Sequence, residues 1–417
     1  MSTSPDVPLR DEHHSIPQTT AWQRLTSHFW ALPAMVTLIS FAVGLGLPRL
    51  DALFPTQWRF IFPGGPDGAR SVLSTIAGAM ISVTGLVFSI TMVVLQLASS
   101  QFTPRVLKEF LSDRAAQYTL GIFIGSFVYA LTVLREVRGG FDGQTAFVPP
   151  MSVSLAYVLV LASMGQFLVF IHRVTSMIQV SEVVSRLGDR TTALVEKIFT
   201  EADSEVRRGD WRVSGDPQEV GLDGRHGHVV EVDEQALVSL AHEHDLRIEL
   251  AVSPGEFLTQ GQPLALVWGD GEDLCSQINA AVRLGADRSL RQDPDFGIRQ
   301  LVDIADRALS SGVNDPTTAV QVVNELERIL KAVAARRDPA CHLADVDGVV
   351  RVHRPQPTLA GMLTLATEEI AHYGREDPRL RRRLDELLAD VRRTALPPHR
   401  ATVERQQQVV RGQWPGQ

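Results

Sequence analysis

Cysteine and lysine are rare in this chain of 417 residues, and the chain has no excess of positive charge. Its two cysteines, Cys275 and Cys341, exclude a disulfide-rich framework and a zinc site built from four cysteines. Lysine occurs only at Lys108, Lys197 and Lys331. The formal net charge of −8 gives no overall basic surface for nucleic acid, so we expect no nucleic-acid partner.

Catalytic sequence motifs are also missing. The chain has no HExxH, P-loop or GxSxG segment, and no GxGxxG segment that leads into a helix. Acidic side chains are scattered along the chain without the spacing that such chemistry requires. We therefore expect no enzymatic activity and no cofactor.

Charged residues are absent from four long stretches, at 29–47, 71–98, 115–134 and 152–171. A helix needs about 20 apolar residues to cross a bilayer core of about 30 Å, and only helical backbone is satisfied in lipid. A soluble protein would need four such buried helices within one half of the chain. The stretches predict a transmembrane domain of four helices over residues 29–172, with the lipid bilayer as its partner.

The flanking positive charges predict an orientation. Residues 1–28 are mostly polar and do not read as a cleavable signal peptide, so we expect a cytoplasmic or interfacial segment there. Eight Lys or Arg residues flank the spans on the side of the termini, against five in the opposite loops. The positive-inside rule then places both termini in the cytoplasm of a bacterial inner membrane.

The second span carries a polar seam at steps of four and three residues. Seven of its eight members are small or uncharged polar residues, and none is charged. The absence of charge argues against a proton relay. The seam comprises Ser71, Thr75, Gly78, Ser82, Gly85, Ser89, Met92 and Gln96.

Two interpretations of this seam stay open. Small residues let helices pack closely, and hydroxyls bond across such interfaces. Alternatively, one such helix from each subunit of a homo-oligomer could line a water-filled pore, since polar groups at membrane depth need a protein or water partner. The third span carries Gly121 and Gly125, a spacing that also predicts close helix packing.

Residues 173–417 are predicted to form a cytoplasmic α+β domain. Alternating apolar and polar residues predict a β-rich stretch at 226–268. The pattern of residues 274–395 predicts helices, and we expect residues 396–417 to form a tail. The segment PGEFLTQGQPLALV resembles the small barrel of biotinyl and lipoyl carrier domains. Because it lacks the lysine that carriers modify, we interpret it as a structural, barrel-like module.

Two histidine pairs fall in the β-rich region. On strands, residues two apart share a face, so the pairs could chelate a transition metal together. A solvated polar hairpin explains the same residues, and we expect no metal site. The pairs are His226 with His228 and His242 with His244.

A helix around Ile298–Leu309 and the turn after it form the candidate cytoplasmic motif. Arg299, Asp303 and Arg307 are spaced as a ladder of opposite charges on the face opposite the apolar residues. Gly312 is expected to stop this helix, and Asn314 lies in the turn. Asp315 and Pro316 are typical of an N-cap and first helical position. An anion could bind at that N-terminus, although capping alone explains the residues.

Three segments together resemble a known family. They are GLVFSITMVVLQLASSQFTPR at 85–105, PGEFLTQGQPLA at 254–265 and GIRQLVDIADRALSSGVNDPTTA at 297–319. This combination resembles the bacterial predicted membrane proteins that are catalogued as domain of unknown function 2254. Ser311 departs from the proline of the family's LSPGINDP-type turn. The resemblance implies the membrane topology but no activity.

The leading functional hypothesis is an oligomeric, channel-like pore that is lined by the second span and gated or assembled by the cytoplasmic domain. The alternative is a non-conducting membrane scaffold or sensor whose cytoplasmic domain binds a ligand or partner. The ion or ligand is not encoded in any recognisable motif.

Overall fold

The computed structural model describes residues 30–53, 62–101, 114–139, 146–199 and 211–414, apart from the side chains of 97–101, 114–115 and 176–178. The segment expected at residues 1–28 lies outside these ranges. The chain divides into two units, of which one ends at Gln179 and the other begins at Val180. The first holds the apolar helices and the second holds the sheets and the remaining helices.

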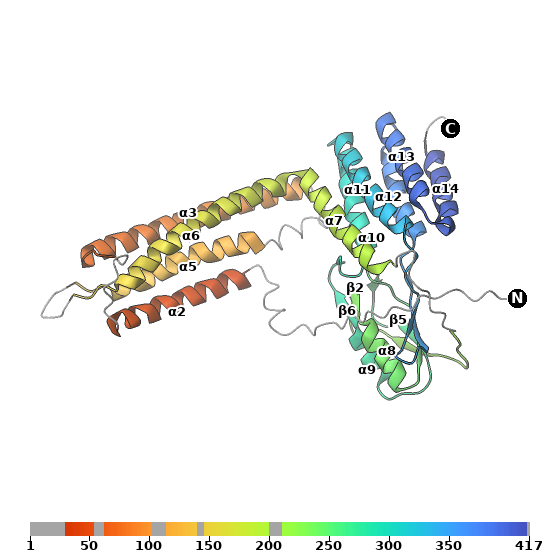
Figure 1. The fold of residues 1–417 in the computed structure, drawn as a ribbon, viewed down its shortest axis with the longest axis horizontal. Helices are drawn as coiled ribbons and strands as arrows, with labels where there is room; N and C mark the ends of the chain where they lie inside the picture. The colour runs from red at the N-terminus through yellow and green to blue at the C-terminus, as the bar shows by residue number, and fades with distance from the viewer. Residues whose placement is uncertain (1–29, 54–61, 102–113, 140–145, 200–210, 415–417) are drawn as a thin grey trace. The chain divides into compact units, whose positions relative to one another are not determined.

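Four helices of the first unit are long and apolar enough to cross a membrane, which confirms the four predicted spans. They run alongside one another (Figure 1). Each extends past at least one end of the charge-free stretch that predicted it, because the helical backbone continues into the polar flank there. The helices are α2 (Ala31–Leu53), α3 (Pro66–Gln101), α5 (Arg114–Glu136) and α6 (Pro150–Ile178).

Helix α5 forms the centre of this bundle. In its apolar window 61% of the residues are buried, against 17–22% in the other three helices. A Cβ added to Gly121 would lie 3.2 Å from the Pro33 Cα, and one added to Gly125 would lie 3.4 Å from Val36 Cγ1. The two glycines therefore let α5 pack closely against α2, as their spacing predicted.

The second unit begins with α7 (Val180–Ile198), directly after α6, and contains two open sheets. The first has the order β1-β5-β3-β8-β7, in which only the β3–β8 pair is parallel, and the second has the order β4-β2-β6. The described strands do not close into a barrel, so the barrel-like expectation is unconfirmed. The strands are β1 (Gln218–Gly221), β2 (Gly227–Val232), β3 (Arg247–Leu250), β4 (Phe257–Leu258), β5 (Pro263–Trp268), β6 (Val282–Gly285), β7 (His342–Ala344) and β8 (Val350–His353).

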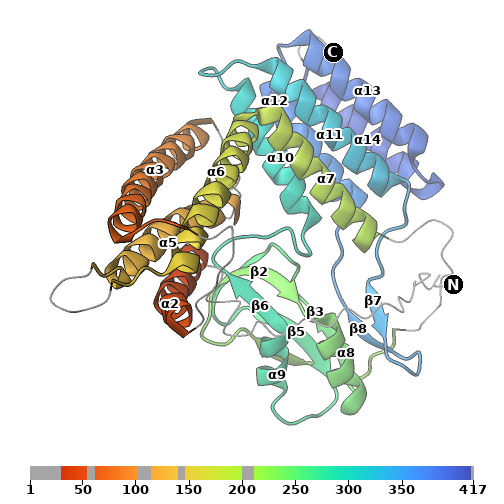
Figure 2. The same cartoon turned by 60° about the vertical axis from the view of Figure 1, so that its left-hand side comes forward.

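Two short helices lie against these strands (Figure 2) and share a hydrophobic core with them. They are α8 (Glu234–Glu243) and α9 (Leu274–Ala281). Leu237 of α8 and Ile278 of α9 are fully buried together with Ile248 of β3 and Leu264 of β5. Burial of each such side chain contributes about 1.5–3 kcal/mol relative to exposure.

The division into a β-rich stretch and a helical stretch differs from the expectation in two places. Helix α8 interrupts the stretch 226–268, because Asp233 caps a helix by accepting a hydrogen bond from the Ala236 amide. Strands β6, β7 and β8 interrupt the stretch 274–395. Strand β6 pairs with β2 and β8 pairs with β3, both distant in sequence, and β7 has only three residues, so local periodicity did not reveal these strands.

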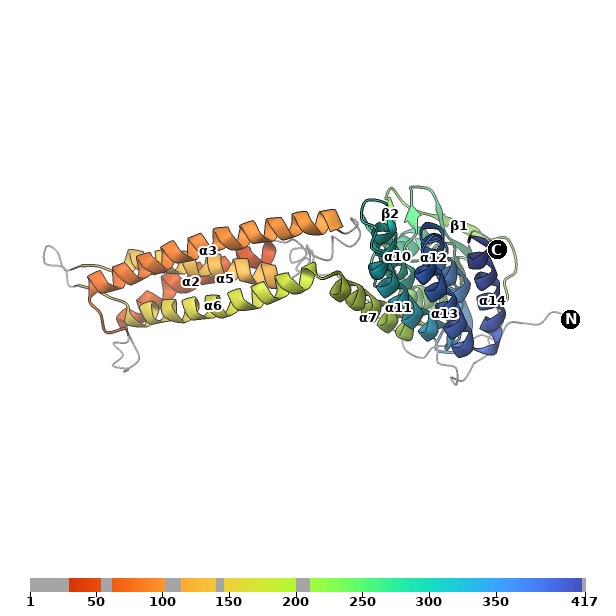
Figure 3. The same ribbon diagram turned by 90° about the horizontal axis from the view of Figure 1, so that it is seen from above.

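The remaining helices lie side by side in a helical layer (Figure 3). Three of them begin at an Asp-Pro pair, in which the aspartate accepts backbone N–H groups and the proline takes the first helical position. Helix α11 contacts α7, α10 and α13, and α10 also contacts α12. The helices are α10 (Pro294–Leu309), α11 (Pro316–Ala334), α12 (Leu359–Tyr373), α13 (Pro378–Thr394) and α14 (Pro397–Gly412).

Helix α14 occupies most of the stretch that was expected to be a tail. Val403 and Val410 are fully buried, and the Gln406 amide donates to Thr367 Oγ1 of α12 at 3.1 Å. The two valines are seven residues apart, so they lie on one helical face, and that face packs on α12 and α13.

Candidate functional site

The polar seam of the second span lies on the outer surface of the helical bundle. All eight of its residues, from Ser71 to Gln96, are exposed on α3. The opposite face of α3 packs against α5 and α6 through Leu73, Ile76, Ala77, Met80 and Val87, all of them buried. Within one protomer, the seam is therefore not the surface by which α3 packs against its own bundle.

Space around the seam is open. A Cβ added at Gly78 or Gly85 would meet nothing within 4 Å. The Thr75 hydroxyl donates to the Ser71 carbonyl at 2.8 Å, and the Ser82 hydroxyl donates to the Gly78 carbonyl at 2.9 Å. These bonds satisfy the hydroxyl protons within the helix, while the hydroxyl oxygens still have lone pairs to offer. The surface can therefore contact either a neighbouring helix or water.

The candidate motif of the second unit splits into two parts, the first of which is a partly buried ion network between α10 and α12. Arg299 donates to Asp303 at 2.6 Å and reaches α12 through two bonds to Glu369, at 2.5 and 2.8 Å. Asp303 is only 5% exposed, so the helix face opposite the apolar residues, where the ladder was expected, is itself buried at this position. The reason is that α7, α11 and α12 surround α10, which leaves it no fully solvated face. Arg307 is half-buried on the same helix.

The network also contains Asp306, whose carboxylate lies 3.6 Å from Arg299. Burial, together with the neighbouring Glu369, raises the pKa of Asp306 to about 8, against the attraction of Arg299. Two carboxyl groups that share one guanidinium cannot both ionise at low cost when they are partly buried. We infer that Asp306 holds a proton near neutral pH.

The second part is the exposed turn from Ser310 to Asn314. Gly312 does not have the left-handed backbone of a glycine stop; Asn314 does, with φ of 49°. Asp315 then caps α11, and hydrogen bonds from the Thr318 hydroxyl and amide, with that of Thr317, lower its pKa. Pro316 lies at the first helical position of α11, as predicted. Capping accounts for these residues.

The four histidines considered for a metal site lie in different elements and make different contacts. His228 is on β2, where its Nδ1 lies 3.1 Å from the Gly255 carbonyl, and His226 precedes that strand. His242 is in helix α8, and His244 is its C-cap, so the second pair is not on a strand at all. The geometry on which the four-histidine arrangement depended is therefore not present.

His242 instead belongs to an ion network with Asp345. Its Nδ1 lies 3.0 Å from Asp345 Oδ2, and Arg351 Nε donates to the same oxygen at 2.7 Å. Burial would raise the pKa of Asp345, but the hydrogen bonds from Arg351 and His242 outweigh it and hold this pKa well below its usual range. Because Arg351 already neutralises this carboxylate, the neighbouring group His242, Asp345 and Asp347 is a poor cation site.

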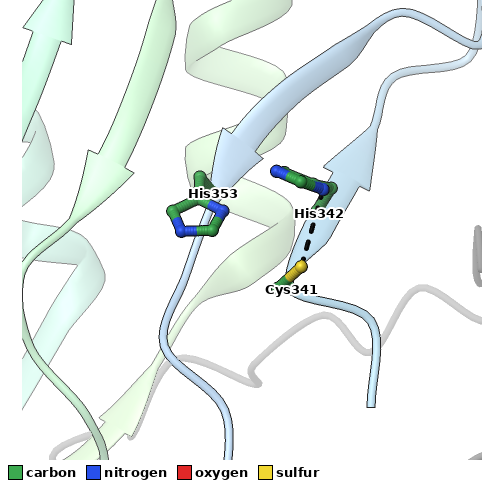
Figure 4. Close-up of side chains that lie close together, drawn as sticks. All are labelled: Cys341, His342 and His353. Carbon is green, nitrogen blue, oxygen red and sulfur yellow. Dashed lines mark hydrogen bonds between the residues drawn. The ribbon is translucent and has the colours of Figure 1, made fainter. Parts of the chain in front are cut away.

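A second cluster, of Cys341, His342 and His353, was missed by the sequence reasoning (Figure 4). His342 and His353 are directly opposite each other on β7 and β8, with ring centroids 4.7 Å apart. The Cys341 Sγ lies 3.5 Å from His342 Nδ1. Burial, with a contribution from His353, lowers the pKa of His342, and burial raises the pKa of the Cys341 thiol. The signal in the sequence was the adjacent Cys-His pair, which needs the strand pairing to acquire its third member.

A cleft of about 150 Å³ lies elsewhere in the second unit. Three cationic side chains line it, together with Glu234, which pairs with one of them. Gln235 Oε1 and Gln356 Nε2 are buried in its walls without a hydrogen-bond partner among the described residues. The cleft could hold a small ligand with both anionic and amide-bonding groups. The cations are Lys197, Arg291 and Arg354.

Comparisons with known proteins agree with the membrane architecture. Residues 26–390 match the family described as "Predicted membrane protein (DUF2254)". The chain is 32% identical over 384 residues to the uncharacterized protein Rv1290c of Mycobacterium tuberculosis and to Mb1321c of Mycobacterium bovis, covering 89% of this chain and 73% of each relative. No solved structure matches. The resemblance found in three sequence segments thus extends over most of the chain, and the protein belongs to the DUF2254 family of predicted membrane proteins.

Proposed function

We propose that the protein forms a homo-oligomeric, channel-like pore that is lined by the polar seam of α3. The observation that carries the proposal is the complete exposure of the seam on the protomer, from Ser71 to Gln96. A row of hydroxyl, glycine and amide groups facing lipid would contribute little packing and would lose its hydration. The same row facing a central axis would meet water or its own symmetry copies.

The seam's composition suits such an axis. Small side chains at Gly78, Ser82 and Gly85 leave room for water where the helices approach most closely, and no seam residue is charged. In a pore without fixed charges, the diameter and the hydroxyl groups of the lining determine which solutes pass, and no ion-exchange site is involved. We propose that the second unit gates or assembles this pore and performs no catalysis.

We further propose a bacterial inner membrane as the location, with both termini in the cytoplasm. The excess of Lys and Arg in the flanks on the side of the termini supports this orientation.

Cysteine accessibility tests the pore. The variants Ser82→Cys and Gly85→Cys place thiols on the seam, and Phe88→Cys places one on an exposed position roughly a quarter-turn away. In liposomes containing the full-length protein, a water-soluble thiol reagent should modify residues 82 and 85 and reduce conductance, while residue 88 stays unmodified in lipid. Peptide mass spectrometry separates these sites from Cys275 and Cys341. Equal modification at all three sites, or no conductance from the wild-type protein, would refute the pore.

The cleft lined by Lys197, Arg291 and Arg354 favours a second candidate function, a non-conducting scaffold or sensor. Here the seam would serve only for packing between subunits, and the cleft would bind an anionic ligand. Inorganic phosphate and citrate are suitable probes. A saturable thermal shift of the full-length protein that is lost in Lys197→Ala, without conductance, would support this function over the pore.

A further inference from the structure

The cluster of Cys341, His342 and His353 has the composition of a transition-metal site. Imidazole nitrogen and thiolate sulfur are the ligands that Zn²⁺ prefers in proteins, and three protein ligands with one open position is an established zinc arrangement. The ligand atoms that the three side chains offer all lie within 4.8 Å of one another. The hairpin that brings them together is short, so their separation is set by backbone pairing rather than by flexible loops.

The register of β7 and β8 fixes the two histidines. His342 pairs with His353 in an antiparallel ladder, so both side chains project from the same face of the sheet. Cys341 immediately precedes β7, and the Arg354 amide donates to its carbonyl at 2.8 Å, which continues the pairing past His353. Cys341 and His342 therefore lie at the start of β7, beside His353 at the end of β8, as the close-up shows (Figure 4).

Distances agree with tetrahedral coordination. Bonds of about 2.0–2.1 Å to nitrogen and about 2.3 Å to sulfur imply ligand-to-ligand separations of roughly 3.4–3.6 Å. The separation of 3.5 Å between Cys341 Sγ and His342 Nδ1 already has this value. The limit of 4.8 Å on the other pairs leaves an adjustment of at most about 1.4 Å, which rotation of the imidazoles about χ1 and χ2 supplies.

One nitrogen of the His353 imidazole is left without a partner. His353 Nδ1 is buried and accepts or donates no hydrogen bond among the described residues. A buried polar nitrogen without a partner costs about 1–3 kcal/mol, so its presence in a satisfied core requires an explanation. Coordination of a metal ion would satisfy this nitrogen.

Aromatic rings cover the cluster on another side. Trp211 stacks on His342 with ring centroids 5.7 Å apart and lies at the same distance from His353, while Trp268 meets Trp211 edge-on at 6.2 Å. The group of His242, Asp345 and Asp347 differs from this cluster because Arg351 already binds the Asp345 carboxylate there.

We propose that Cys341, His342 and His353 bind one Zn²⁺ ion per chain, with the fourth coordination position taken by water. Both histidines bind as neutral imidazoles, and the Cys341 thiol releases its proton to solvent as the Zn–S bond forms. No oxidation state changes. The ion ties the start of β7 to the end of β8, and hence the chain leaving α11 to the chain entering α12.

Metal titration of the full-length protein tests this site. The protein is purified in detergent through an affinity tag without histidine, stripped with a chelator and titrated with Zn²⁺ and separately with Co²⁺. We expect one equivalent to bind, a rise in the melting temperature, and a thiolate-to-cobalt charge-transfer absorption. Cys341→Ser and His353→Ala should each weaken Zn²⁺ binding at least tenfold, which is about 1.4 kcal/mol.

Matched controls separate the site from surface binding. Cys275→Ser removes the other, exposed cysteine, and His226→Ala removes an exposed histidine outside the cluster, so both should bind Zn²⁺ like the wild type. Circular dichroism checks that each variant is folded. If His353→Ala is unfolded, the cobalt absorption of the wild type and its loss in Cys341→Ser decide the question. Wild-type protein without the thiolate absorption, or with binding unchanged in Cys341→Ser, would overturn the proposal.

Discussion

The carboxylate of Asp51 near the end of α2 caps the first turn of α6 through Ser152. Asp51 Oδ2 accepts hydrogen bonds from the Ser152 amide at 3.0 Å and from its hydroxyl at 2.7 Å, and Oδ1 accepts from the Met151 amide at 3.1 Å. Asp51 is only 7% exposed. The amides of a helix N-terminus carry positive partial charge, so they compensate an acidic residue that would otherwise be costly beside the bilayer.

This contact predicts a specific loss of stability. Asp51→Ala leaves two α6 amides and one hydroxyl without their acceptor, and should lower the free energy of unfolding by about 1–2 kcal/mol. The thermal midpoint of the full-length protein in detergent measures the effect. Asp67→Asn, at an exposed position in the first turn of α3, is the control and should melt like the wild type. Equal midpoints for Asp51→Ala and the control would contradict the capping role.

Glycines of the bundle should respond to valine according to their surroundings. Gly121→Val places side-chain atoms against Pro33 and Val36 of α2, where even a Cβ would be 3.2 Å from each, and should cost about 1–3 kcal/mol. At Gly85 a valine side chain meets open space within the chain. The intrinsic helix propensity of valine is the same at both positions, so the two variants differ only in their surroundings. Gly85→Val should leave the thermal midpoint of the monomer unchanged and weaken self-association. Cross-linking in membranes measures the second effect, and unchanged cross-linking in Gly85→Val would count against a seam between subunits.

Gly297 of α10 packs against Thr191 of α7. A Cβ at Gly297 would stand 2.8 Å from Thr191 Cγ2 and 2.9 Å from Leu290 Cδ2. Gly297→Ala should therefore destabilise the protein by about 1–3 kcal/mol, although alanine is intrinsically the better helix former. Thermal unfolding checks this, with Gly312→Ala as a control because nothing lies within 4 Å of that site. Adding Thr191→Ala should recover part of the loss, and a strictly additive double variant would show that the two residues are not coupled.

The protonated state of Asp306 predicts a pH dependence with a definite sign. Its pKa is raised from the ordinary range near 4 to about 8 in the folded protein, so between these values the folded state holds a proton that the unfolded state has lost. The contribution of Asp306 to the free energy of unfolding therefore falls as pH rises from about 4 to 8, with a slope of at most about 1.4 kcal/mol per pH unit. Outside that window the contribution is constant.

Asp306→Asn should remove this slope. An amide imitates the protonated carboxyl at every pH, so the variant should gain in thermal midpoint over the wild type as pH rises from 5 to 8. Glu386→Gln, on the exposed face of α13, is the control for loss of one acidic group at the surface. Parallel melting curves for the wild type and Asp306→Asn across this range would show that Asp306 is ionised throughout.

Prediction from the sequence succeeded where the signal is local. Charge-free stretches located the four spans, and the pair Asp315–Pro316 marked the start of α11. It failed where a residue's surroundings come from distant parts of the chain. The spacing of Arg299, Asp303 and Arg307 predicted the Arg299–Asp303 pair, but it could not show that three other helices bury Asp303 or that Glu369 joins the pair.

By itself, the sequence determined that this chain has four helices long and apolar enough to cross a membrane, a seam of small and polar residues on the second, and a helix that begins at Asp315–Pro316. These features depend on hydropathy and on hydrogen bonds within a few residues, which local sequence controls. Only the tertiary structure decided that the seam points away from its own bundle and that His353 joins Cys341 and His342. Both outcomes depend on which helix faces and which strands pair, and those choices are made by burial across the whole fold.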